Sequence, residues 1–159
     1  MEKKTNAVRK LDQKKIKYMY HSFEIKEVPT GAEVAKIIDR NVNQVFKTLV
    51  TQGKSKEYYV FVIPVCMELN LKKAAKATNE KSIAMIKSKE LLPITGYIHG
   101  GCSPIGMKKA FKTCFHISIK EEDIIIFSAG KIGRQIEMKV VDLHKVIKYD
   151  VFDVADKKE

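Results

Sequence analysis

The chain has 159 residues, of which 45% are hydrophobic, and its 30 Lys and Arg against 19 Asp and Glu give a formal net charge of +11. This length and hydrophobic content suit one folded domain over residues 1–159 and exclude an intrinsically disordered chain. No apolar run approaches the roughly 20 residues of a membrane helix, and residues 1–6 do not begin a secretory signal. Three cysteines without close pairing do not indicate a disulfide framework. We therefore expect a cytoplasmic protein.

Thr5 or Asn6 can cap a basic helix that runs to about residue 15, and residues 16–23 then have the composition of a strand. After a break at the Pro-Thr-Gly sequence, Thr30 and Glu33 have capping-box spacing. This spacing predicts the start of a second helix.

Residues 45–50, V-F-K-T-L-V, and residues 58–65 predict the two strands of a hairpin joined by a Gly-Lys-Ser turn. Alternate side chains of a strand share a face, so Lys47 would lie between Val45 and Leu49 on one face. A lysine there has two interpretations. It can cover apolar surface with its stem while its ammonium group reaches water, or it can be a cation on the floor of a partly apolar pocket, ready to bind phosphate or to stabilise an oxyanion.

The rest of the chain predicts further short elements. Asn70 can cap a helix over residues 71–77, and a helical turn is expected at 89–92. We expect strands at 83–86, 113–119, 123–128 and 135–140, a last helix at 141–149, and a charged tail at 153–159 that frays. Because strands and helices alternate without regular βαβ spacing, the predicted fold class is α+β. We expect a mixed, largely antiparallel sheet that curls toward a barrel, with helices around it.

Two glycine-rich loops are candidate binding segments. In residues 96–106 the Gly100-Gly101 pair permits close backbone approach, and Ser103-Pro104 resembles an N-cap followed by the first helical residue. The N–H groups after it could hold an anion or a carbonyl oxygen. The segment S-A-G-K-I-G-R that begins at Ser128 could present a hydroxyl to a substrate. On their own, the two loops are more simply interpreted as an ordinary tight turn and as a hairpin turn with solvated Lys131 and Arg134.

The net charge favours a polyanionic partner such as RNA, DNA or anionic lipid, although a generally lysine-rich proteome would give the same composition. A zinc site would need the set His99, Cys102, Cys114 and His116, whose spacing is not that of common zinc sites. A catalytic cysteine–histidine pair has no supporting local context. We expect no metal and no cofactor.

Four segments occur in an order that resembles the YbaK/EbsC family: V-F-K-T-L (45–49), L-N-L-K-K-A-A-K (69–76), T-G-Y-I-H-G-G-C-S-P-I-G (95–106) and F-S-A-G-K-I-G (127–133). This family comprises free-standing deacylases of mischarged tRNA and is related to the editing domain of bacterial prolyl-tRNA synthetases. The resemblance covers essentially the whole chain, and its nearest branch looks like the Cys-tRNA(Pro) deacylases.

The resemblance implies a YbaK-like fold and a set of site residues. Its central lysine falls on Lys47 and its substrate-loop glycine on Gly101. The other substrate-binding positions that it implies are Phe23, Thr30, Gly31, Thr48, Ser103, Pro104, Ser128 and Gln135. Many relatives carry an acidic residue where this chain has Gln135, which puts the role of a carboxylate there in doubt. Candidates for contacts with the tRNA backbone are Lys72, Lys73, Lys76, Lys108, Lys109 and Lys112.

The reaction that the resemblance implies is release of an amino acid from the 3′ end of tRNA. The substrate's own thiol would attack its carbonyl, while Lys47 and backbone N–H groups near Gly101 supply positioning and electrostatic stabilisation. Water is the alternative nucleophile. Phosphate contacts position a nucleic acid without specifying it, so prolyl-tRNA synthetase is an expected partner for tRNA choice. No DNA or membrane partner is expected. Two other interpretations stay open: a deacylase for another amino acid, such as the alanine of Ala-tRNA(Pro), and a non-catalytic tRNA-binding module.

Overall fold

The computed structural model describes residues 2–25 and 27–158. Its helices are α1 (Asn6–Gln13), α2 (Gly31–Ile37), α3 (Leu71–Thr78) and α4 (Ser88–Thr95), with short 3-10 helices η1 (Val42–Gln44), η2 (Ile117–Glu121) and η3 (Val140–Lys145). Its strands are β1 (Tyr18–Ser22), β2 (Phe46–Gly53), β3 (Tyr58–Pro64), β4 (Met67–Leu69), β5 (Ile83–Met85), β6 (Lys112–His116), β7 (Ile124–Ser128), β8 (Arg134–Lys139), β9 (Asp150–Phe152) and β10 (Ala155–Lys157).

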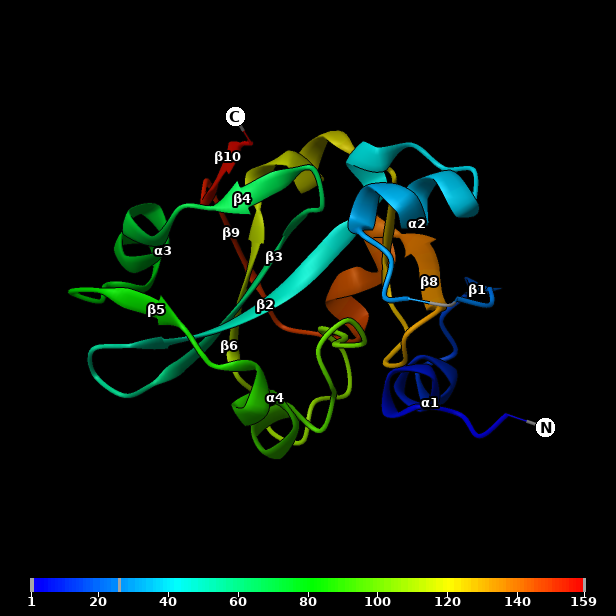
Figure 1. The fold of residues 1–159 in the computed structure, drawn as a ribbon, viewed down its shortest axis with the longest axis horizontal. Helices are drawn as coiled ribbons and strands as arrows, with labels where there is room; N and C mark the ends of the chain where they lie inside the picture. Colours follow the sequence, from blue (N-terminus) through cyan, green and yellow to red (C-terminus); the bar gives the residue numbers. More distant parts are fainter. Residues whose placement is uncertain (1, 26, 159) are drawn as a thin grey trace.

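The strands form three sheets. The largest has the order β5-β2-β3-β6-β9, a second has the order β1-β8-β7, and β10 pairs with β4. Only the β3–β6 and β6–β9 pairs are parallel among these. A single bridge between Val45 and Ile126 joins the start of β2 to β7. The predicted α+β fold with mixed, largely antiparallel strands and surrounding helices is confirmed (Figure 1), and the described strands fall into three adjoining sheets rather than one closed barrel.

Both faces of the largest sheet are buried. Along β3, Val60 and Val62 pack into one apolar cluster with α1 and η3, whereas Phe61 and Ile63 pack into another with α3. Successive strand residues point to opposite faces. Because both faces of β3 are buried, almost every residue of this strand is apolar. Its two neighbours on the sheet, β2 and β6, shield the rest of its surface.

The predicted helix starts are confirmed. The Thr5 hydroxyl accepts the Val8 N–H at 3.2 Å, and the Asn70 side chain accepts the Lys73 N–H at 3.0 Å. Thr30 forms the predicted capping box at the start of α2. In each case a side-chain oxygen satisfies an N–H group that has no partner within the helix. None of the described helices is long and apolar enough to cross a membrane.

Two predicted boundaries are wrong. The strand expected over residues 113–119 ends at His116, where η2 begins and buries Ile119. The helix expected over residues 141–149 is replaced by the short η3 and an extended segment into β9. Tertiary pairing decides this region, because β9 must run parallel to β6 and Tyr149 packs against the ring of Phe115.

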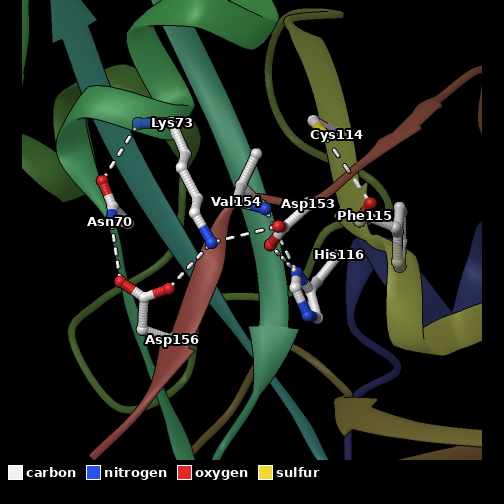
Figure 2. A network of polar contacts seen from close by, with 8 residues as sticks. All are labelled: Asn70, Lys73, Cys114, Phe115, His116, Asp153, Val154 and Asp156. Carbon is white, nitrogen blue, oxygen red and sulfur yellow. Dashed lines mark hydrogen bonds and ion pairs between the residues drawn. The ribbon is translucent and has the colours of Figure 1, made fainter.

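The prediction that the tail frays is also wrong. β10 pairs with β4, and Val154 is fully buried. Figure 2 shows the Lys73 ammonium group between Asp153 and Asp156, at N–O distances of 3.0 and 2.9 Å. The Val154 N–H donates to Nδ1 of His116 at 3.2 Å. Charges that looked solvated in the sequence therefore attach the tail to α3 and β6.

His116 makes the attachment of the tail sensitive to pH. Burial is the largest influence on the pKa of His116 and lowers it, and the Lys73 ammonium group acts in the same direction. The carboxylates of Asp153, 4.0 Å away, and Asp156 act to raise this pKa but do not outweigh burial. Below the ordinary histidine pKa of about 6.5 the unfolded chain then binds more protons than the folded one, so the free energy of unfolding falls as pH decreases. We expect a lower urea midpoint at pH 5.5 than at pH 7.5. His116→Gln should lack this part of the change, and an identical pH dependence in both proteins would contradict the prediction.

Candidate active site

The free edge of β2 lines a small pocket. β5 pairs only with residues 51–53 of β2 and β7 bridges it only at Val45, so no strand of the described residues has a ladder with residues 46–50 on that side. The Val50 carbonyl points to this side, since it accepts the Ile86 N–H at 3.3 Å. The N–H and C=O groups of alternate residues in an antiparallel strand point the same way. Thr48 therefore turns its backbone polar groups away from β3 and toward this open edge.

Several segments enclose the pocket, which has a volume of about 200 Å³. β2 forms its floor, the start of α2 and Val65 after β3 form one wall, and the end of β7, the start of β8 and the glycine loop form the others. Its lining residues are Pro29, Gly31, Val34, Val45, Phe46, Lys47, Thr48, Leu49, Val65, Leu91, His99, Gly100, Cys102, Ser128 and Gln135. No carboxylate is among them. The volume is below the range of about 300–1,000 Å³ for drug-sized ligands, so the pocket fits a small group such as an aminoacyl moiety.

Lys47 supplies positive charge to this pocket. Its side chain is half-buried, and no carboxylate of the described residues forms an ion pair with it. Burial lowers the pKa of Lys47 and the charge of Lys158 adds to this, whereas Glu68 and Cys66 oppose it. A partly desolvated ammonium group without a fixed anion interacts strongly with any negative charge that a ligand brings or develops.

Three neutral polar side chains accompany the lysine. Thr48 Oγ1 is buried and has no hydrogen-bond partner among the described residues. Ser128 and Gln135 lie directly opposite each other in the β7–β8 pair, and the Ser128 hydroxyl accepts the Gly130 N–H at 3.1 Å. An unpartnered buried hydroxyl costs free energy unless a ligand or water pairs with it. Thr48 thus marks the place where a ligand's polar group would be accommodated.

Comparison with known proteins identifies the family. Residues 25–146 match the aminoacyl-tRNA editing domain. A protein of Enterococcus faecalis, named "Putative Cys-tRNA(Pro)/Cys-tRNA(Cys) deacylase EbsC", is 46% identical over 138 residues, which cover 86% of this chain and 84% of the relative. The chain belongs to the aminoacyl-tRNA editing domain family.

Two solved structures share the fold. The hypothetical protein APE2540 superposes with a TM-score of 0.86 at 17% identity, covering 96% of this chain and 100% of its own. A structure named "a putative trans-editing enzyme for prolyl tRNA synthetase" has a TM-score of 0.81 at 19% identity and covers 99% of this chain and 100% of its own. The shared fold therefore covers nearly the whole chain, including residues outside the matched range 25–146.

The editing domain brings five of the predicted site residues to one pocket: Gly31, Lys47, Thr48, Ser128 and Gln135. Gly31 permits α2 to approach β3 closely, because a Cβ at this position would lie 2.2 Å from the Val65 side chain. His99 and Cys102 also line the pocket. The sequence singled them out only as possible metal ligands or as a catalytic pair, although their place in the glycine loop could have indicated a lining role.

Other predicted residues lie near the pocket without lining it. The Gly101 N–H donates to the Ile98 carbonyl at 3.0 Å, so it closes a turn and is not free for a carbonyl oxygen of a substrate. A Cβ on Gly101 would lie 3.0 Å from the Ile132 nitrogen, which makes this glycine a close contact between two loops. Ser103 is fully buried, and its hydroxyl accepts the Ile105 N–H at 3.3 Å.

The remaining three predicted site residues have structural contacts outside the pocket. Pro104 is buried and lines a different cavity. Phe23 packs beside α2, and its N–H donates to the Gly133 carbonyl. Thr30 is the exposed cap of α2. The structure thus assigns Thr30 and Ser103 to backbone capping and turn formation, roles that depend on the same residue types as ligand binding.

Glu137, two residues after Gln135, has one carboxylate oxygen, Oε1, bound by two side chains. It accepts hydrogen bonds from Arg40 Nε at 2.7 Å and His21 Nε2 at 2.9 Å. Burial acts to raise its pKa, but these two hydrogen bonds outweigh burial and lower it. Glu137 therefore stays ionised within an internal network, and Gln135 leaves the neighbouring pocket position neutral.

The positions of the cysteines exclude a shared metal site, and burial disfavours a nucleophilic role for Cys102. Cys102 packs with the α1 side of the sheet and Cys114 with the α3 side, so they cannot ligate one metal ion together with His99 and His116. Burial raises the pKa of the Cys102 thiol to about 12, which makes it a poor nucleophile at neutral pH. No group of three or more metal-ligating side chains gathers elsewhere in the described ranges.

Proposed function

We propose that this chain is an aminoacyl-tRNA deacylase that acts in trans on mischarged tRNA in the cytoplasm, with Cys-tRNA(Pro) as its main substrate and residues 1–159 as one catalytic domain. The observation that carries the proposal is the pocket itself. It is small, contains one half-buried cation, and has neither a carboxylate base nor an activated nucleophile. The name of the Enterococcus faecalis relative supports the choice of substrate.

A substrate thiol explains how such a pocket could work. The cysteinyl sulfur would attack its own ester carbonyl, forming an S–C bond while the C–O bond to the ribose breaks. The thiol proton would pass to the departing ribose oxygen, leaving a cyclic thioester and free tRNA. Lys47 would favour the thiolate and the developing oxyanion electrostatically. An intramolecular attack needs mainly orientation, for which effective molarities of about 10⁵–10⁸ M are available.

Gln135 fits this chemistry better than an acid would. A carboxylate beside the substrate would raise the pKa of its thiol and oppose the charge of Lys47. The neutral amide of Gln135 and the hydroxyls of Thr48 and Ser128 can orient the aminoacyl group without adding negative charge. The pocket is therefore selective for a substrate that brings its own nucleophile.

The identity of the tRNA must be read outside the pocket, because about 200 Å³ holds little more than an aminoacyl group. We propose that prolyl-tRNA synthetase supplies this selection by presenting tRNA(Pro) to the deacylase. The name of the second solved structure, which refers to prolyl tRNA synthetase, supports this partner.

Deacylation of matched substrates tests the proposal. We expect Cys-tRNA(Pro) to be hydrolysed at least about 10²-fold faster than Ser-tRNA(Pro), which differs only by oxygen in place of sulfur, because the thiolate is much the better internal nucleophile. Trapping of a cyclic thioester product would confirm internal attack. Equal rates for the two substrates would indicate attack by water, fastest cleavage of Ala-tRNA(Pro) would indicate an alanine deacylase, and tRNA binding without hydrolysis of any ester would overturn the enzymatic function.

A further inference from the structure

A second cavity, which we call the lysine groove, opens on the α1 side of the largest sheet. Its volume is about 760 Å³, nearly four times that of the small pocket. Six lysines line it together with a single acidic residue, Asp150. The lysines come from three separate segments and are Lys10, Lys14, Lys109, Lys112, Lys145 and Lys148.

The fold brings these lysines together through buried contacts of their neighbours. Leu11 on α1 and Val146 after η3 belong to the same apolar cluster. Gly106 allows the glycine loop to approach α1 so closely that an added Cβ would lie 2.7 Å from the Asn6 carbonyl carbon. Lys10, in the last turn of α1, and Lys14, its C-cap, both line the groove at the C-terminal end of this helix.

Most of this charge is not neutralised within the protein. Of the six lysines only Lys145 has an ion pair among the described residues, with Asp142 at 2.9 Å. The contrast with α3 is clear, because Lys73 there is held by Asp153 and Asp156. Repulsion among like charges on a folded surface costs free energy, and a polyanion that binds them removes this cost.

The lysine groove adjoins the active-site pocket along the chain. The glycine loop lines the pocket with Gly100 and Cys102, and two residues later Pro104 begins to line the groove. Two residues of extended backbone span at most about 7 Å, and successive phosphates of one strand rise about 3.4 Å along a duplex. A nucleic acid whose 3′ end enters the pocket would therefore place phosphates only a few nucleotides away within reach of the groove.

We propose that the lysine groove binds the phosphodiester backbone of the tRNA acceptor arm while the aminoacylated 3′ end occupies the pocket. This inference rests on the proposed deacylase function for its choice of RNA. The sequence-based prediction placed tRNA backbone contacts largely on α3. The groove places them on α1 and on the segment after η3 instead. Of the predicted lysines, Lys109 and Lys112 then contribute to tRNA binding, whereas Lys72, Lys73 and Lys76 do not. Lys108 is not part of the groove either, since its side chain lies over Gly96.

A charge-matched pair of triple variants tests the proposal. The groove variant is Lys10→Gln, Lys14→Gln and Lys148→Gln, and the control is Lys54→Gln, Lys81→Gln and Lys120→Gln, three exposed lysines outside the groove. The Kd for uncharged tRNA is measured between about 50 and 200 mM salt. We expect the groove variant to bind at least about 10-fold more weakly at low salt, with a salt slope reduced by about 2 to 3, whereas the control keeps the wild-type slope.

A second readout separates this inference from the deacylase function. Cleavage of Cys-tRNA is compared with cleavage of a minimal ester, 3′-O-cysteinyl adenosine, which lacks the acceptor arm. The ratio of the two kcat/KM values should fall at least about 10-fold in the groove variant and not in the control. Equal tRNA binding by both variants would overturn the proposal that the groove binds tRNA, even if the wild type is an active deacylase. Weakened tRNA binding in a protein that cleaves neither substrate supports the groove and overturns the deacylase. Binding to phosphatidylserine vesicles in place of tRNA overturns the choice of RNA.

Discussion

Replacement of Lys47 with methionine is expected to lower kcat for Cys-tRNA deacylation about 10²-fold or more, the scale of losing one preorganised electrostatic contact. Methionine has a similar length and is apolar, so it can occupy the space between Val45 and Leu49. Because the variant no longer desolvates a charge, it should fold at least as well as the wild type. Single-turnover deacylation with saturating enzyme measures the effect on the chemical step, and urea unfolding checks the fold.

Lys54→Met is the matched control, because Lys54 lies exposed in the turn between β2 and β3. Near-normal turnover by Lys47→Met would mean that the lysine only covers apolar surface. The pH profile gives an independent check. Since burial lowers the pKa of Lys47, its charge is lost at a lower pH than that of an ordinary lysine, and wild-type activity should decline there after correction for spontaneous ester hydrolysis. Lys47→Met should not show this decline.

Gly106→Ala is expected to destabilise the fold by about 2–4 kcal/mol. Gly106 has a φ of +80°, and an added Cβ would lie 2.8 Å from both the Ala7 nitrogen and the Tyr97 hydroxyl oxygen. The backbone of α1 cannot move away without exposing Leu11, which is fully buried. The hydroxyl is equally constrained, since it donates to the Ile105 carbonyl at 2.7 Å.

Gly96→Ala separates the cost of the positive φ angle from the cost of steric overlap with α1 and Tyr97. Gly96 has a φ of +88°, but its added Cβ would meet only the flexible Lys108 side chain, 3.1 Å away at the nearest atom. This control should lose only the roughly 1–2 kcal/mol of a left-handed non-glycine residue. The free energy of unfolding from urea titration measures both variants. Equal losses would show that Gly106 is needed only for its φ angle and not for the approach of α1 to the loop.

Local signals in the sequence were sufficient for the strands and helix starts that surround the site. The alternation in V-F-K-T-L-V placed Lys47 correctly opposite the core residues Phe46 and Val50, because the side-chain period of a strand needs no tertiary information. The caps at Thr5, Thr30 and Asn70 were predictable for the same reason, since each side-chain oxygen accepts the N–H of the residue three positions later.

The composition of the pocket was decided by tertiary structure. Only the pairing of β5 with the far end of β2 leaves Thr48 at an open edge, and no local pattern encodes where a partner strand stops. Ser103 and Gly101 have the residue types of a binding loop, yet the first is buried and the second packs on Ile132, because the loop closes onto its neighbours. Residue type and spacing specify what a side chain can bind, but its access to a ligand depends on which distant backbone covers it.

The charged residues likewise show which properties the sequence determined and which depend on tertiary structure. The sequence by itself determined an excess of lysine and hence an attraction for polyanions. Tertiary structure decided which lysines are free to attract a polyanion. The tail folds back so that Asp153 and Asp156 neutralise Lys73, whereas Lys10 and Lys14 form no ion pair among the described residues. Coulomb interactions depend on distance through space, and the distances between residues far apart in the chain exist only once the core has packed.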